Sequence, residues 1–177
     1  ACLWDGRPAS DRSPTPATRH RPDLHRGACA QPSPTRPRPP TVTDTFADLL
    51  PDLRDLRRDL HAHPELGFAE HRTAALVADA MRALGLEVAT GIGGTGVVAT
   101  LRNGGGSPSI GLRADMDALP IVERSGLPHA SVNPGVHHGC GHDGHTAMLI
   151  GAARQLTRSR RFDGSVHFIF QPAEEGQ

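Results

Sequence analysis

Apolar side chains recur at spacings of three and four residues from position 46 onward, which is the pattern of an amphipathic helix. The positions are Phe46, Leu49, Leu50, Leu53, Leu56 and Leu60. Pro51 interrupts the series, so the pattern predicts either a turn followed by a helix with Pro51 in its first turn, or a kinked helix. Pro64 ends it. A second helix is predicted over residues 70–84, because apolar residues fall on one face and Gly85 follows as a stop signal.

Short apolar runs in the second part of the chain predict strands. They cover residues 86–90, 97–101, 109–114 and 165–170. Two glycine-rich stretches between them, 91–96 and 103–106, are predicted to be turns, the second consistent with a hairpin. The first is only superficially like a phosphate-binding loop, because it lacks the Lys-Ser/Thr ending and a strand follows it.

A third helix is predicted from Asp143 to about residue 156, with Asp143 as its N-cap. Its inward face would consist of Ala147, Ile150, Ala153 and Leu156. The segment before it, 121–136, is a loop punctuated by Pro and Gly. The order of strands, a helix and a further strand predicts an α/β fold, a partial mixed sheet flanked by helices with sites at strand ends.

The first 40 residues have a different composition from the rest, with nine of the 16 prolines, seven arginines and three acidic residues. Such sequence cannot bury enough apolar surface to offset the entropy of ordering. We therefore predict a disordered Pro/Arg-rich segment over 1–42 and a folded region over 43–177. A nucleic-acid-binding arm is the alternative, although no motif supports it. Because the chain starts with Ala1 and ends directly after an acidic cluster, it is expected to be a fragment of a longer protein.

Charge and composition narrow the range of partners. The chain has 19 basic residues, all arginine, against 19 acidic ones, and 3% aromatic residues. This balance gives no reason to expect nucleic acid or a membrane as a partner. No apolar run is long enough to cross a bilayer and no signal-peptide pattern is visible, so a cytoplasmic location is expected. Three scattered cysteines (Cys2, Cys29 and Cys140) do not suggest a disulfide framework.

Side chains of the metal-ligand type crowd a glycine-rich stretch directly before the third helix. Cys140 and His142 stand two positions apart there, and a thiolate with an imidazole suits Zn²⁺ or a similar ion. Three more histidines lie nearby: His137, His138 and His145. Each of them is a further ligand, a group that supports a ligand or merely an exposed residue. A cysteine nucleophile is the alternative, but a base only two residues away is geometrically awkward. Metal-dependent hydrolysis is therefore the preferred interpretation.

Carboxylates follow two of the predicted strands. After strand 165–170, one of Glu174 and Glu175 can ligate an ion while its neighbour activates a water as general base. After strand 109–114, Asp115 and Asp117 are expected to point to opposite sides, so that at most one faces a common site. The alternative for this second pair is hydrogen bonding to the backbone of a turn.

The histidines at the end of the first helix have a structural interpretation. His61 and His63 lie close to the predicted C-terminus, where a histidine interacts favourably with the helix dipole. Neither requires a ligand role.

Four motifs occur in the order and approximate spacing of one family: DLHAHPELG at 59–67, LRADMDALP at 112–120, HGCGHDGH at 138–145 and QPAEEG at 171–176. Over about residues 45–177 the sequence resembles the aminoacylase-type metallo-amidohydrolases. This metallopeptidase family includes hippurate hydrolases, N-acyl-amino-acid deacylases and plant auxin-conjugate hydrolases. Two departures are Gly139, where the family often has Ala, and His137, where Met is usual.

The resemblance implies an enzyme that hydrolyses the amide bond of N-acyl amino acids or similar small amides with two divalent metal ions (Zn, Mn, Co or Ni). Cys140, His142 and Glu175 would be metal ligands, Glu174 the general base and Asp117 a supporting acid.

The resemblance further implies that the chain is the N-terminal part of a dinuclear metallopeptidase-like catalytic domain. Two more histidine ligands and a lid or dimerisation domain, which allows a homodimer, would follow Gln177. The chain by itself is expected to be inactive. The alternative for the whole protein is a truncated, inactive remnant that at most binds metal.

Overall fold

The computed structural model describes residues 46–176. The segment 1–42, predicted to be disordered, lies outside the described residues. In chain order the helices and strands are α2 (Leu50–Ala62), α3 (His71–Ala83), β1 (Glu87–Ile92), β2 (Gly96–Asn103), β3 (Ser109–Asp115), α4 (His142–Ser159) and β4 (Gly164–Gln171). None of these helices is both long and apolar enough to span a lipid bilayer.

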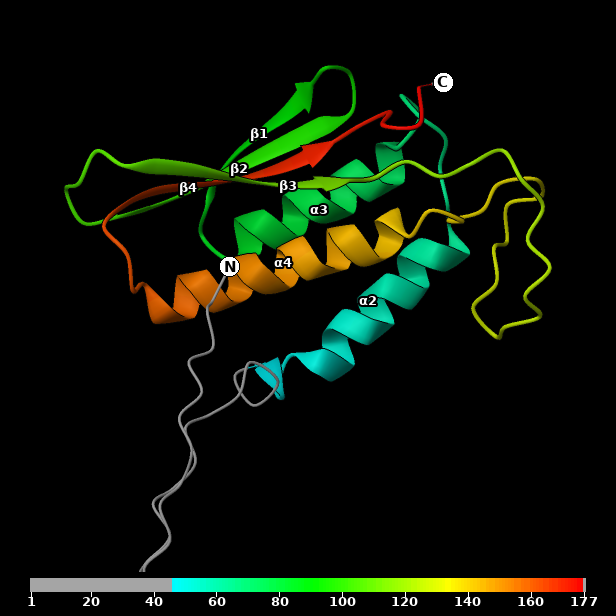
Figure 1. Cartoon of the computed structure of the whole chain (residues 1–177), viewed down its shortest axis with the longest axis horizontal. Helices are drawn as coiled ribbons and strands as arrows, with labels where there is room; N and C mark the ends of the chain where they lie inside the picture. The colour runs from blue at the N-terminus through cyan, green and yellow to red at the C-terminus, as the bar shows by residue number, and fades with distance from the viewer. Residues whose placement is uncertain (1–45, 177) are drawn as a thin grey trace, which may run out of the picture. The chain divides into compact units, whose positions relative to one another are not determined.

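The four strands form one mixed sheet in the order β1-β2-β4-β3 (Figure 1). β1 and β2 are an antiparallel hairpin, β2 pairs antiparallel with β4, and β3 pairs parallel with β4. The hairpin predicted at 103–106 is therefore wrong. The chain crosses over from β3 through α4, as parallel pairing requires, and returns as β4 between β2 and β3. The predicted α/β fold with a partial mixed sheet is confirmed.

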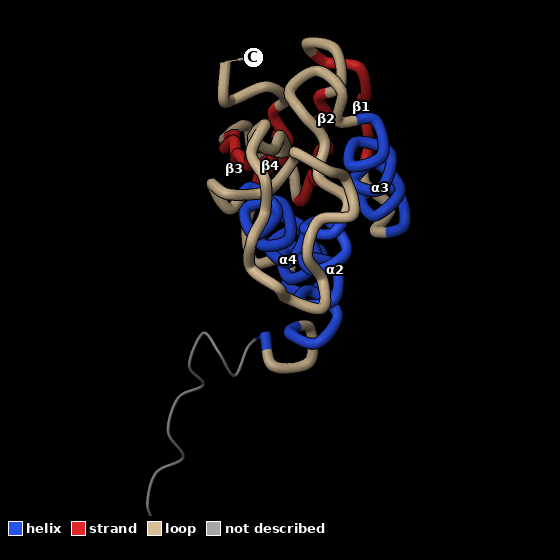
Figure 2. The backbone as a smooth tube through the Cα atoms, turned by 90° about the vertical axis from the view of Figure 1, so that its right-hand side faces the viewer, coloured by secondary structure: helices blue, strands red, loops and turns tan. Residues whose placement is uncertain are grey.

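The helices cover one face of the sheet. α3 and α4 pack against the strands, and α2 packs against α4 on the side away from the sheet (Figures 1 and 2). On β4, burial alternates along the strand, so that Val166, Phe168 and Phe170 point into the core while their neighbours are half-buried. β4 ends at Gln171, and the acidic pair that follows lies near His142 at the start of α4.

The first two helices agree with the sequence pattern except at one position. α2 has Pro51 in its first turn, which confirms the first of the two alternatives. Leu49 and Leu60 are buried, whereas Leu50 is 48% exposed, contrary to expectation. Adjacent helical residues are about 100° apart around the axis, so one narrow face cannot bury both Leu49 and Leu50. Gly85, with φ of 75°, follows α3 as predicted.

The start of α4 differs from the prediction. The helix begins at His142, and its N-cap is Gly141 at φ 93°, a left-handed conformation that glycine adopts without strain. The prediction of Asp143 as N-cap is wrong. The carboxylate of Asp143 accepts hydrogen bonds from His61 at 2.8 Å and from Arg57 at 3.2 Å, so it binds α2.

Two isolated bridges hold the segments around the strand ends. Leu66 pairs with Ala118, and Leu119 pairs with His137. The first bridge places the motif at 59–67 beside the end of β3, and the second places the loop before α4 there. These contacts bring three of the four motifs together.

Glu70, fully buried, connects three segments of the fold. Its carboxylate accepts a hydrogen bond from the Thr95 hydroxyl, in the β1–β2 turn. It also accepts one from the backbone N–H of Ala173 at 2.8 Å, in the loop after β4. Glu70 therefore fixes the loop that carries Glu174 and Glu175.

We predict that Glu70→Ala lowers the free energy of unfolding by about 2–4 kcal/mol, because two buried groups lose their acceptor and a cavity remains. Glu70→Gln should cost less, because its amide can accept from Ala173 and donate to Thr95. Urea denaturation monitored by circular dichroism measures both. Glu87→Ala, at an exposed position of β1, is the control and should change the free energy by less than about 0.5 kcal/mol. Equal effects of Glu70→Ala and Glu87→Ala would contradict the role of Glu70.

Candidate metal centre

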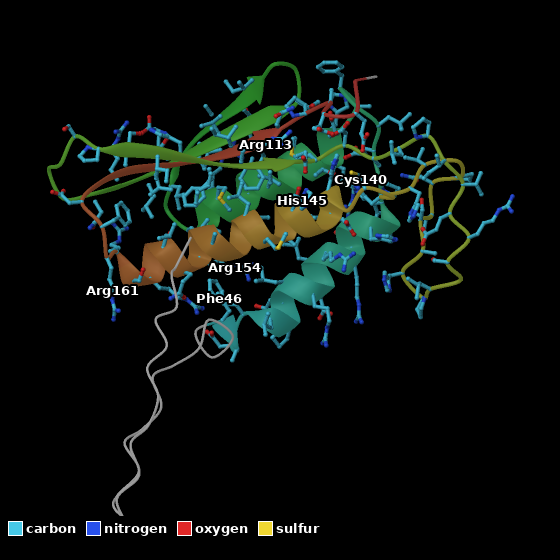
Figure 3. The ribbon with its side chains drawn as sticks, in the orientation of Figure 1. Phe46, Arg113, Cys140, His145, Arg154 and Arg161 are labelled. Carbon is cyan, nitrogen blue, oxygen red and sulfur yellow. The ribbon has the colours of Figure 1, made fainter. Side chains whose placement is uncertain are left out.

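The ligand atoms of Cys140, His142 and Glu175 lie within 4.8 Å of one another. Cys140 and His142 come from the turn and first residue of α4, and Glu175 comes from the loop after β4. Figure 3 shows Cys140 and His145 at the beginning of α4, near the end of β3. The three residues that the resemblance implies as ligands are thus brought together.

The orientation of His142 is set by a backbone carbonyl. Its ring is 2% exposed, and its Nδ1 lies 2.8 Å from the carbonyl oxygen of Asp117. A carbonyl only accepts, so Nδ1 donates this hydrogen bond and Nε2 is the ring nitrogen left to ligate an ion. That Nε2 lies 3.8 Å from a carboxylate oxygen of each of Glu174 and Glu175. The imidazole therefore presents its basic nitrogen to the acidic pair, as a metal ligand does.

Asp117 is buried beneath this arrangement. Its Oδ2 accepts the backbone N–H of Glu175 at 2.9 Å, and its Oδ1 lies 3.4 Å from Nδ1 of His142. The side chain therefore holds the loop after β4 and the His142 ring in a fixed relation.

Asp115 lies near the other nitrogen of the same imidazole. Its Oδ2 lies 3.6 Å from Nε2 of His142, and its Oδ1 lies 2.6 Å from Nδ1 of His145. Burial by itself raises the pKa of Asp115, but the hydrogen bond with His145 and the positive charges nearby hold that pKa below its ordinary value. The ligand atoms of Asp115, His142 and His145 also lie within 4.8 Å of one another. His142 thus belongs to two adjacent groups of candidate ligands.

The expectation that at most one of Asp115 and Asp117 faces the site is wrong. Both carboxylates lie within 4 Å of the His142 ring. Side chains two positions apart on extended backbone share a face, so the spacing itself favoured convergence.

The thiol and the acidic pair fit a divalent cation. The hydrogen bond with Glu175, then burial and the neighbouring carboxylates, raise the pKa of the Cys140 thiol. Oε1 of Glu175 is buried and has no hydrogen-bond partner among the described residues. A buried acceptor without a donor requires an explanation, and a thiol, an imidazole nitrogen and a carboxylate are ligands for zinc and similar ions.

Glu174 differs from its neighbour in exposure. Its side chain is 39% exposed, against 20% for Glu175, although a carboxylate oxygen of each lies 3.8 Å from His142. It can therefore contact the ligand group and exchange protons with solvent.

The remaining histidines of the 137–146 stretch divide between two places. His145 stacks on His142 with ring centroids 5.5 Å apart. His137 and His138 lie instead near His61, at centroid distances of 5.2 and 6.4 Å. Glu123 also contacts His61, and the sequence analysis did not single it out.

Comparison with known proteins agrees with this geometry. Residues 111–177 match the model of peptidase family M20/M25/M40. A hippurate hydrolase of Campylobacter jejuni is 50% identical over 129 residues, which cover 73% of this chain and 33% of that protein. An N-acyl-L-amino acid amidohydrolase of Geobacillus stearothermophilus is 47% identical over 67% of this chain and 32% of its own length. The chain spans about a third of the length of such relatives.

A solved structure gives the same result. The YXEP protein of Bacillus subtilis, described as a dinuclear metal binding peptidase from the M20 family, matches with a TM-score of 0.70 and 44% identity. The match covers 73% of this chain and 37% of that one. The sequence motifs, the mixed sheet and the arrangement of Cys140, His142 and Glu175 agree with these matches, and over residues 111–177 the chain is similar to peptidase family M20/M25/M40.

Proposed function

We propose that this chain supplies part of the centre of a metal-dependent amidohydrolase that cleaves the amide bond of N-acyl amino acids or similar small amides. The observation that carries the proposal is the convergence of Cys140, His142 and Glu175 within 4.8 Å, with Glu174 next to them. The activities for which two relatives are named, hippurate hydrolase and N-acyl-L-amino acid amidohydrolase, support this substrate class.

Cys140, His142 and Glu175 would hold metal, with Asp115 and His145 adjoining through the shared His142. The related YXEP protein binds two metals, so we propose two divalent ions in the complete centre. Such ions polarise an amide carbonyl and make water more acidic. The backbone carbonyl of Asp117 keeps the His142 lone pair directed at the ligand group.

Glu174 is the proposed general base. Its carboxylate would accept the proton of the attacking water and later return it to the leaving nitrogen. The exposure of its side chain suits this task, because the group must meet water and substrate. Asp117 acts as a positioning residue, since its contacts are with His142 and with the backbone of Glu175.

In the full-length protein, we expect release of the free amino acid from N-benzoyl- and N-acetyl-amino acids. A chelator should abolish the activity and added Zn²⁺, Mn²⁺ or Co²⁺ should restore it. A folded, metal-loaded protein without turnover on such a panel would exclude this substrate class. A folded protein that binds no metal would favour the inactive remnant.

Glu174→Gln in the full-length protein should lower kcat by about 10²–10⁴-fold, because the amide cannot accept the water proton. Metal content should be unchanged, since Glu175 and not Glu174 is the proposed ligand. Turnover assays with elemental analysis test both points. Glu87→Gln, the same chemical change at an exposed position of β1, is the control. Full turnover in Glu174→Gln would remove this residue from the mechanism.

Metal affinity should increase with pH, because an ion must displace the proton of a Cys140 thiol whose pKa is raised. The dissociation constant is expected to fall by up to about tenfold per pH unit below that pKa. Zn²⁺ titrations against a competing chelator between about pH 6 and about pH 8 measure the slope. Cys140→Ala should bind less metal and show a shallower slope. The same affinity and slope in Cys140→Ala as in the parent would overturn the ligand role.

A further inference from the structure

A second group of candidate ligands lies away from this centre. We define the His61 cluster as His61 at the end of α2 with Glu123 and His137 from the loop before α4. Their ligand atoms lie within 4.8 Å of one another, and none of the three belongs to the Cys140 centre. We propose that the His61 cluster binds its own transition-metal ion, of the Zn²⁺ type, which fastens the 121–137 loop to α2.

The distances within the cluster fit such an ion. Nε2 of His61 lies 3.2 Å from Oε1 of Glu123, and Nδ1 of His137 lies 3.3 Å from Oε2 of the same carboxylate. A tetrahedral ion with bonds of about 2.0–2.1 Å holds its ligand atoms about 3.3–3.4 Å apart. The carboxylate thus already lies at tetrahedral ligand separation from both rings.

His61 has the environment of a metal-ligating histidine. Its Nδ1 lies 2.8 Å from Oδ2 of Asp143, a carboxylate that also accepts from Arg57. Nε2 of the same ring lies 3.2 Å from Oε1 of Glu123, so a proton or a cation must lie between these two atoms. A metal ion can take the place of that proton, and a carboxylate behind the imidazole is the usual support of a metal-bound histidine.

Glu123 is held as an oriented anion. Its side chain is 5% exposed, and it accepts hydrogen bonds from the Ser125 hydroxyl and, at 2.6 Å, from the backbone N–H of Ser131. Burial raises its pKa, but these hydrogen bonds and His61 together hold that pKa well below its ordinary value. Ligating carboxylates are commonly oriented by such bonds.

His137 provides an independent observation. Its Nδ1 is buried and has no hydrogen-bond partner among residues 46–176, although it lies 3.3 Å from Glu123. A buried nitrogen that lies 3.3 Å from a carboxylate oxygen without a hydrogen bond to it leaves room for an ion between the two atoms.

A cavity borders His61, and a further histidine lies close to it. A cavity of about 240 Å³ adjoins the cluster and is lined by Arg54, Arg57, Arg58, His61, His129 and Asp143. The ring of His129 lies 5.5 Å from that of His61, which makes His129 or a water the candidate fourth ligand. Of the arginines, Arg57 is paired with Asp143.

The proposed ion would reinforce contacts that already dock the loop. The N–H of Val132 donates to the carbonyl of Ala62 at 2.8 Å, and the Asn133 side chain donates to the carbonyl of Pro64 at 2.9 Å. His137 lies three residues before Cys140, so the ion would also restrain the approach to the Cys140 centre. Its role is structural, and the inference does not depend on the hydrolase activity.

Metal stoichiometry tests the proposal. The intact chain would be stripped with a chelator, equilibrated with micromolar Zn²⁺, freed of unbound ion and subjected to elemental analysis. His137→Met and Glu123→Gln should each bind about one ion per chain fewer than the parent. The matched control is His71→Met, which removes an exposed imidazole at the start of α3 and should change nothing.

Co²⁺ spectra distinguish the two sites. Cys140→Ala should remove the thiolate-to-cobalt charge-transfer band. His137→Met should retain that band and lose only the absorption of Co²⁺ that has no thiolate ligand. The increase in melting temperature caused by Zn²⁺ should be smaller in His137→Met than in His71→Met. These readouts are independent of turnover.

The proposal is overturned if His137→Met binds as many ions as the parent, or if the additional ion binds only at millimolar Zn²⁺. In either case a doubly protonated His61 bridges Asp143 and Glu123 without a metal. Loss of Glu123 hydrogen bonds could unfold the loop in Glu123→Gln. His137→Met then decides, because the Nδ1 atom it removes has no hydrogen-bond partner among the described residues.

Discussion

The hydrogen bond between Nδ1 of His142 and the backbone carbonyl of Asp117 is the contact on which the centre depends. It connects the first residue of α4 with the segment that follows β3, and it fixes which ring nitrogen carries a proton. Gly141 permits it, since its left-handed conformation lets the helix begin directly under the strand ends. Everything else in the centre is arranged around the free nitrogen that results.

That free nitrogen lies among negative charges. Carboxylates of Asp115, Glu174 and Glu175 lie 3.6–3.8 Å from it, and the same carboxylates raise the pKa of the Cys140 thiol. A raised thiol pKa and a buried carboxylate oxygen without a donor therefore have one cause, an excess of acceptors around a small volume. A divalent cation would stabilise the thiolate and the unpaired carboxylate oxygen together, whereas protonation of one group satisfies only that group.

Local patterns in the sequence predict what depends on local physics. The apolar spacing around α2 and α3, the alternation along β4 and the Pro51 start all follow from helix and strand periodicity. Which strands pair with one another does not follow from periodicity, because β4 inserts between β2 and β3 only after the chain has passed through α4. In the same way the motifs identified Cys140, whereas nothing local marked Glu123, whose partner His61 is 62 residues away.

The first two residues of α4 act on opposite sides. His142 faces the Cys140 centre, while the carboxylate of Asp143 binds His61 and Arg57 on α2. Successive helical residues diverge by about 100°, so a single turn can serve two sites without sharing a ligand. The hydrogen bond from His61 to Asp143 therefore holds the same turn of α4 from which His142 reaches the acidic pair.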